Sequence, residues 1–164
     1  MKKMYLAAAV LFLSYGTVHA ADEPSLKEGL WSIHDVDTTN PGNKVSDSTH
    51  SICRSHAWDQ EVQAESKKVM KSCTVLTDTT AGSKRVTEAR CQVAGTTITT
   101  KAIITSLNEN TVHSETHATY SPALGNVSDT TTIQDQKYQG SCPAGISPGD
   151  MILPNGTVRH LWKH

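Results

Sequence analysis

Residues 96–121 read TTITTKAIITSLNENTVHSETHATYS, and this stretch determines the fold class. Apolar side chains recur at alternate positions, at Ile98 and Ile104 in the first half and at Val112 in the second. The Asn-Glu-Asn segment at 108–110 is typical of a turn. Because side chains alternate between the two faces of a strand, the stretch predicts two antiparallel strands with one buried and one solvated face.

β-branched residues and turn signals continue on both sides of this stretch, apart from one segment with helical spacing. There Ser55 can cap a helix over 55–71 that carries Trp58 and Val62. We therefore expect a mainly β fold: a single curved antiparallel meander sheet of about seven or eight strands, open or barrel-like, with one helix packed on its apolar face. The strands are predicted at residues 29–38, 47–54, 72–79, 84–94, 96–107, 111–121 and 126–139.

The first twenty residues have the features of a secretory signal. Two lysines precede an apolar run over residues 4–13, and a small-residue cleavage site ends at Ala20. Removing this segment would leave 144 residues with a formal net charge of −3. We expect a periplasmic or secreted protein, with a β-rich disulfide-stapled domain at 21–142 and a Pro/Gly-rich C-terminal arm at 143–164.

The charge balance disfavours two classes of partner. The chain has 15 Lys and Arg against 16 Asp and Glu, a formal net charge of −1, and no run of like charges that would bind nucleic acid or an anionic membrane. After the signal, no apolar stretch approaches the roughly 18 residues that a membrane span needs. We expect a monomer with no nucleic-acid partner and no integral membrane span.

Four cysteines in an exported chain predict two disulfides, which would supplement a core poor in aromatic residues. Cys53, Cys73, Cys91 and Cys142 allow three connectivities, and sequence alone does not separate them. We favour Cys53–Cys73, which would clamp the ends of the helix, and Cys91–Cys142, which would tie an interior strand to the end of the last one.

Several short motifs are familiar in combination. They are GLWSI at residues 29–33, the order of the four cysteines along the predicted strands, and YQGSC at 138–142 after a Thr-rich strand. In this respect the chain resembles domain-of-unknown-function family 3617, a family of exported bacterial proteins, although the family commonly has an acidic residue where Ser32 stands. The resemblance implies fold and compartment and no particular chemistry.

The sharpest pattern for chemistry is His113-x-Glu115-x-His117. A row of this composition suits zinc or copper. Residues two apart on a strand point from the same face about 6.8 Å apart, so a metal would need help from an adjacent strand. Because this row lies opposite the apolar residues, ordinary solvated side chains explain it more simply.

Two other histidine groupings are weaker. His50-x-x-Cys53-x-x-His56 has metal-like spacing, but a disulfide at Cys53 would remove the thiolate ligand. His160 and His164 lie near the chain end. We interpret both groupings as ordinary surface histidines.

Three tryptophans and two carboxylates complete the candidates. Trp31, Trp58 and Trp162 either fill the core, with Trp31 packing on Trp58, or line a ligand face. Asp35 and Asp37 fit a solvated strand edge. We favour the core role for the tryptophans because the chain has few other aromatic residues to fill its interior.

We predict no catalytic residue and no cofactor. The sequence contains no Gly-x-Ser-x-Gly motif, and all four cysteines are expected to be in disulfides. The sequence favours a non-catalytic binding module for a small apolar or amphipathic ligand, or for an envelope protein such as an enzyme that it would inhibit. The alternative is a metal-binding protein or metal-dependent enzyme that holds zinc or copper with His113, Glu115 and His117.

Overall fold

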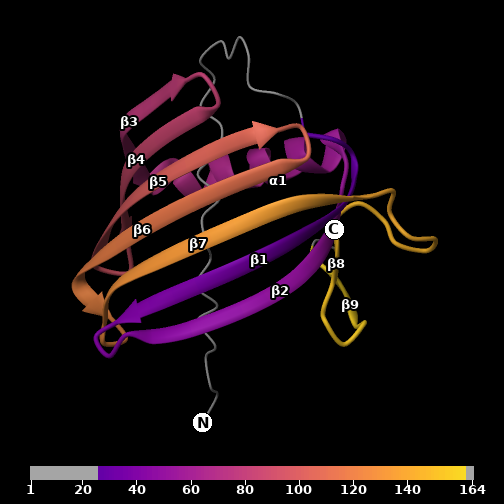
Figure 1. Ribbon diagram of the computed structural model, residues 1–164. Helices are drawn as coiled ribbons and strands as arrows, with labels where there is room; N and C mark the ends of the chain where they lie inside the picture. Colours follow the sequence, from indigo (N-terminus) through magenta and orange to yellow (C-terminus); the bar gives the residue numbers. More distant parts are fainter. Residues whose placement is uncertain (1–25, 162–164) are drawn as a thin grey trace.

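The computed structural model describes residues 26–161, which form one nine-stranded antiparallel sheet and one α-helix (Figure 1). The signal predicted for residues 1–20 lies outside the described residues, as do Trp162 and His164. The strands are β1 (Gly29–Asn40), β2 (Lys44–Arg54), β3 (Cys73–Ala81), β4 (Lys84–Val93), β5 (Thr96–Asn108), β6 (Thr111–Leu124), β7 (Val127–Gly140), β8 (Asp150–Ile152) and β9 (Val158–His160). The helix α1 (His56–Val69) and the 3-10 turn η1 (Met70–Ser72) connect β2 to β3.

The order of the strands is β3-β4-β5-β6-β7-β1-β2-β8-β9, and the sheet is not closed into a barrel. All seven predicted strands are confirmed, with ends that differ by up to three residues. The sheet differs from a plain meander because β7 pairs with β1 along nearly its whole length. The hairpin of β1 and β2 therefore continues the five-strand meander β3–β7, and β1 lies inside the sheet.

The predicted helix is confirmed, and its ends follow from local chemistry. Ser55 is the N-cap, and its side chain accepts a hydrogen bond of 3.1 Å from the backbone N–H of Trp58. Asp59 in the first turn and Lys67 and Lys68 in the last turn suit the helix dipole. Because β2 and β3 lie far apart in the sheet, α1 has to cross it, and Figure 1 shows the helix passing behind β5 and β6.

The two faces of the sheet differ. We call the face that carries Trp31 and Ile33 the inner face, and the opposite one the outer face. Trp31, Ile33, Ile52 and Val112 form the buried cluster of the inner face, and Trp58 of α1 packs against it. This contact confirms the core role expected for Trp31 and Trp58, and it shows that α1 covers the inner face.

The favoured disulfide pairing is wrong. The bonds are Cys53–Cys142 and Cys73–Cys91. Cys73 and Cys91 are direct partners in the β3–β4 register. Leu30 at the start of β1 pairs with Cys53 on one side and with Gly140 on the other, which brings Cys142 to Cys53. The crossing of α1, in contrast, carries Cys73 to the far edge of the sheet.

The C-terminal arm is more ordered than its composition indicates. After the Cys53–Cys142 bond it adds β8 beside β2, and β9 beside β8, so the sheet has nine strands where about seven or eight were expected. Gly149 of this arm lies against Trp58: a Cβ atom there would stand 2.6 Å from the indole Nε1. With a φ of +92° as well, this position requires glycine.

Candidate functional site

Along β1 the inner face changes from apolar to polar. Trp31 and Ile33 are buried in the core cluster, and Asp35 and Asp37 follow at alternate positions. The interpretation of the two carboxylates as a solvated strand edge is wrong, because β1 lies between β7 and β2. The Asp35 side chain retains 15% of its accessible surface. Carboxylates this far from solvent need hydrogen-bond partners.

The partners come from β7. Thr132 Oγ1 donates to Asp37 at 2.5 Å, and Gln134 Nε2 donates to Asp35 at 2.7 Å. Gln136 Nε2 in turn donates to Gln134 Oε1 at 2.5 Å. Thr132, Gln134 and Gln136 are each less than 9% exposed. These five side chains lie side by side on the inner face, and we call them the inner network. Their hydrogen bonds join one pair, Asp37 and Thr132, and one row of three, Asp35, Gln134 and Gln136.

Arg54 connects the inner network to the helix. Its guanidinium donates to Gln136 Oε1 at 3.0 Å and lies 3.0 Å from the Asp59 carboxylate on α1. The same guanidinium stands 5.5 Å from the centre of the Trp31 ring, within cation–π range. Burial raises the pKa of Asp59, and the Arg54 charge opposes that shift.

His50 borders the other side of the network. Its Nδ1 lies 3.5 Å from Asp35 Oδ2. Burial lowers the pKa of His50, with a smaller opposing effect from the Asp35 carboxylate, so the neutral imidazole is favoured near neutral pH. Thr132, Gln134 and Gln136 are buried and paired, whereas the His50 and Asp35 side chains retain 18% and 15% of their accessible surface. These two are therefore the groups that could meet a ligand with hydroxyl, amide or amine groups.

Beside the polar part, the inner face of β4–β6 carries both apolar side chains and buried polar ones such as Thr87 and Thr100. Ala89, Ala102 and Ala118 are buried, and Ile98, Ile104 and Tyr120 are half-buried. The inner face therefore carries polar groups on β7 and β1 and, beside them on β4–β6, a surface where apolar side chains alternate with buried threonines, which we call the mixed strip.

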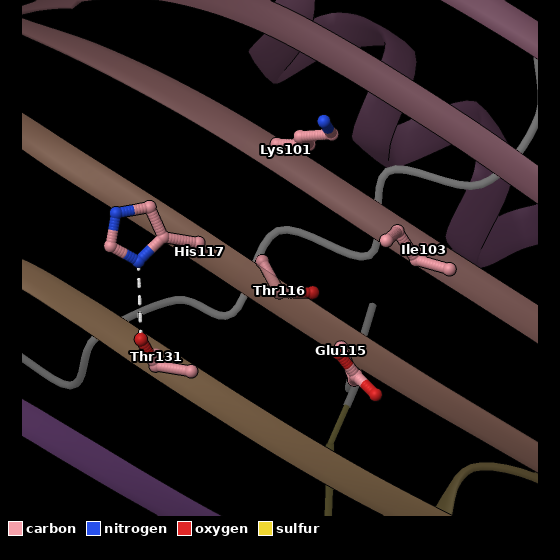
Figure 2. Close-up of a pocket in the computed structure, with 6 residues that line it drawn as sticks. All are labelled: Lys101, Ile103, Glu115, Thr116, His117 and Thr131. Carbon is pink, nitrogen blue, oxygen red and sulfur yellow. Dashed lines mark hydrogen bonds between the residues drawn. The ribbon is translucent and has the colours of Figure 1, made fainter.

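The predicted metal residues lie on the outer face of β6. Figure 2 shows that Glu115 and His117 point away from one another, with Thr116 between them. His117 Nδ1 lies 3.1 Å from the Thr131 hydroxyl, whereas His113 contacts the carboxylate of Asp135. Within residues 26–161, no group of three or more His, Cys, Asp or Glu side chains is arranged to hold a metal ion.

His113 belongs instead to an ion-pair cluster. Its Nδ1 lies 2.7 Å from Asp135, directly opposite on β7, and its Nε2 lies 3.2 Å from Glu115. The hydrogen bond with Asp135 raises the pKa of His113, and Glu115 adds to that effect. The outer face also has a shallow hollow, shown in Figure 2 and lined by Lys101, Ile103, Glu115, Thr116, His117 and Thr131.

The remaining histidine groupings do not assemble. His50 faces Asp35, whereas His56 at the start of α1 contacts Leu26 and Glu28. Cys53 between them is in a disulfide, as expected. His160 on β9 binds the buried carboxylate of Asp150. Trp31 has no exposed surface, so its role is packing.

Sequence reasoning missed the inner network, although a signal for it exists. Thr130, Thr132, Gln134 and Gln136 occupy alternate positions of one predicted strand and so share a face. Polar residues in such a row normally indicate solvent. Only the register with β1 reveals that the row faces inward beside Trp31 and Ile33.

We expect the pKa of His113 to lie above the ordinary value for histidine and the pKa of His50 to lie below it. The raised pKa of His113 adds stability at low pH that is lost as the pH rises through that pKa, whereas His50 lowers stability as the pH falls below its unfolded-state pKa. NMR titration of the imidazole protons measures both. Asp135→Asn should lower the pKa of His113 and leave His50, on the opposite face, unchanged. A His113 unaffected by this change would contradict the ion-pair cluster.

Comparison with models of known protein families and with curated protein sequences gives no match. The resemblance to family 3617 therefore rests on the cysteine order and the short motifs alone. Within residues 26–161, no helix has the length and apolar character needed to cross a lipid bilayer.

Proposed function

We propose that the chain is an exported, non-catalytic binding module that holds a small amphipathic ligand on its inner face. The observation that supports this proposal is the side-by-side arrangement of the inner network and the mixed strip on a sheet that is not closed. Ligand sites in proteins typically combine an apolar lining with a few fixed polar groups. Because α1 covers the inner face, the ligand would lie between α1 and the sheet. Its apolar part would lie on Ile98, Ile104 and Tyr120, and its polar part on Asp35 and His50.

The compartment and the absence of chemistry are part of the same proposal. Two disulfides are typical of oxidising compartments, and the signal features and the resemblance to family 3617 point the same way. The inner network holds its carboxylates and amides in mutual hydrogen bonds, an arrangement that fixes them for recognition. No cysteine thiol is free in the described chain.

Substitution of two neighbouring threonines on β7 tests whether the ligand binds on the inner face. Thr130 faces inward, with its Oγ1 3.2 Å from the Tyr120 hydroxyl, and Thr131 faces outward, with its Oγ1 3.1 Å from His117 Nδ1. Both are half-buried, and each would lose one hydrogen bond on substitution. Thr130→Phe is expected to fill the ligand site, and Thr131→Phe is the matched control on the outer face.

The measurement is native mass spectrometry of tag-free protein purified from its own compartment. We expect a retained ligand mass on the wild type and on Thr131→Phe, and none on Thr130→Phe. A ligand retained equally by both variants would place the site elsewhere, and no retained mass in the wild type would contradict the proposal. Retained zinc or copper would favour the metal protein, a retained protein would favour the inhibitor, and either result would overturn the small-ligand proposal.

A further inference from the structure

Strand β3 leaves one long edge of the sheet without a partner. It is the first strand in the sheet order and pairs only with β4, and no strand within residues 26–161 pairs with its other side. Figure 1 shows β3 as the outermost strand of the meander. On the opposite side of the sheet, β9 has three residues, and β8 pairs with β2 only at Ser51 and Ile52. The open part of β2 carries Lys44 and Asp47, whereas β3 has nine residues and a single charge. Such an edge presents a row of backbone N–H and C=O groups that another strand can pair with.

The composition of β3 does not block pairing. Natural edge strands are protected by lysine, proline or bulges. β3 has neither lysine nor proline, and its single charge, Asp78, is neutralised by a two-point contact with Arg85 at 2.9 and 2.8 Å. Val75 and Leu76 are 56% and 43% exposed. A bulge at Leu76 interrupts the ladder on β4, and the longer regular part runs over residues 77–81.

The register of this ladder indicates the partner. Two copies of residues 77–81 can pair antiparallel about a two-fold axis at Thr79, in the self-complementary manner of closed dimers. Thr79 then faces Thr79 of the second copy, and Asp78 faces Thr80 of the second copy. Threonine pairs across strands are favourable, and no like charges stand directly opposite each other. Two identical segments match in length and register at all five positions, so a second copy of the chain fits this edge.

We infer that β3 is a homodimer interface, through which two copies of this chain join their sheets into one continuous sheet. The formal net charge of −3 expected for the exported chain leaves little repulsion between two copies. This assembly replaces the monomer expected from the sequence. It is independent of the inner face, because β3 lies at the edge most distant from β1 and β2.

Sedimentation of the wild-type chain over roughly 1 µM to 1 mM tests the dimer. Thr79 is exposed, so Thr79→Lys leaves the monomer intact but places two lysines opposite each other across the axis. We expect this variant to raise the dissociation constant at least tenfold. The matched control is Thr119→Lys, an exposed threonine of the interior strand β6, which should dimerise like the wild type.

A charge swap makes the test specific for this register. Thr79→Glu alone should also be monomeric, and an equimolar mixture of Thr79→Lys and Thr79→Glu should recover a dimer, because the opposite charges then face each other. A wild-type monomer at all concentrations would overturn the inference. The inference would also be overturned if Thr119→Lys weakened the dimer as much as Thr79→Lys does. A mixture of Thr79→Lys and Thr79→Glu that stays monomeric would overturn it too. Circular dichroism of each variant confirms that it is folded.

Discussion

Trp31→Ala is expected to lower the free energy of unfolding by about 3–5 kcal/mol, the usual cost of removing a large buried aromatic side chain. Trp31 has no exposed surface, and its ring packs edge-on against Tyr138 with centroids 5.8 Å apart. Its indole Nε1 donates to the Lys27 carbonyl at 2.9 Å. Since small domains are stable by roughly 5–15 kcal/mol in total, the variant should be close to unfolding. Urea unfolding followed by circular dichroism measures the loss.

Two further variants separate packing from hydrogen bonding. Trp31→Phe keeps an aromatic ring beside Tyr138 but loses the hydrogen bond to the Lys27 carbonyl. Its free energy of unfolding should therefore fall by less than that of Trp31→Ala. Leu107→Ala, at a leucine that is 61% exposed, should change stability by no more than about 0.5 kcal/mol. A Trp31→Ala variant as stable as Leu107→Ala would contradict the assignment of Trp31 to the core.

Local patterns predicted the elements of this fold well. The alternation around Ile98 and Val112 correctly separated the buried from the solvated face, because strand periodicity is a property of a few consecutive residues. The capping serine at Ser55 likewise gave the start of α1. Both signals lie within a single element and need no knowledge of its neighbours.

The order of strands was not available from such patterns. The pairing of β1 with β7 joins segments about a hundred residues apart, and nothing in residues 29–40 specifies that neighbour. The mistaken interpretation of Asp35 and Asp37 follows from this. A polar row on an edge strand faces water, whereas the same row on an interior strand requires partners such as Gln134.

The candidate metal row shows the same limit at the level of a site. His113, Glu115 and His117 do share one face, as expected from their spacing. Their partners are set by the strands on either side, and Asp135 opposite His113 takes up that imidazole. Same-face spacing on one strand therefore predicts exposure correctly without predicting which side chains converge.

The disulfide error has a related cause and leads to a test. A Cys53–Cys73 bond requires the two ends of the helical segment to lie close together. Instead, α1 crosses the sheet and separates Cys53 from Cys73. A peptide map under non-reducing conditions should join the Cys53 peptide to the Cys142 peptide, and the Cys73 peptide to the Cys91 peptide. A Cys53–Cys73 link would show that the strand order itself is wrong.

Removing the two bonds should have unequal effects. The Cys53–Cys142 bond spans 89 residues and the Cys73–Cys91 bond spans 18. Because a longer closed loop restricts the unfolded chain more, we expect the double variant Cys53→Ala and Cys142→Ala to lose about 4–5 kcal/mol, against about 3 kcal/mol for Cys73→Ala and Cys91→Ala. Urea unfolding of both variants measures the difference. The first variant also frees the start of the arm that carries β8 and Gly149, so hydrogen exchange should increase there and in β2. A larger loss in the second variant would contradict the role of the Cys53–Cys142 bond in holding the arm and β2 together.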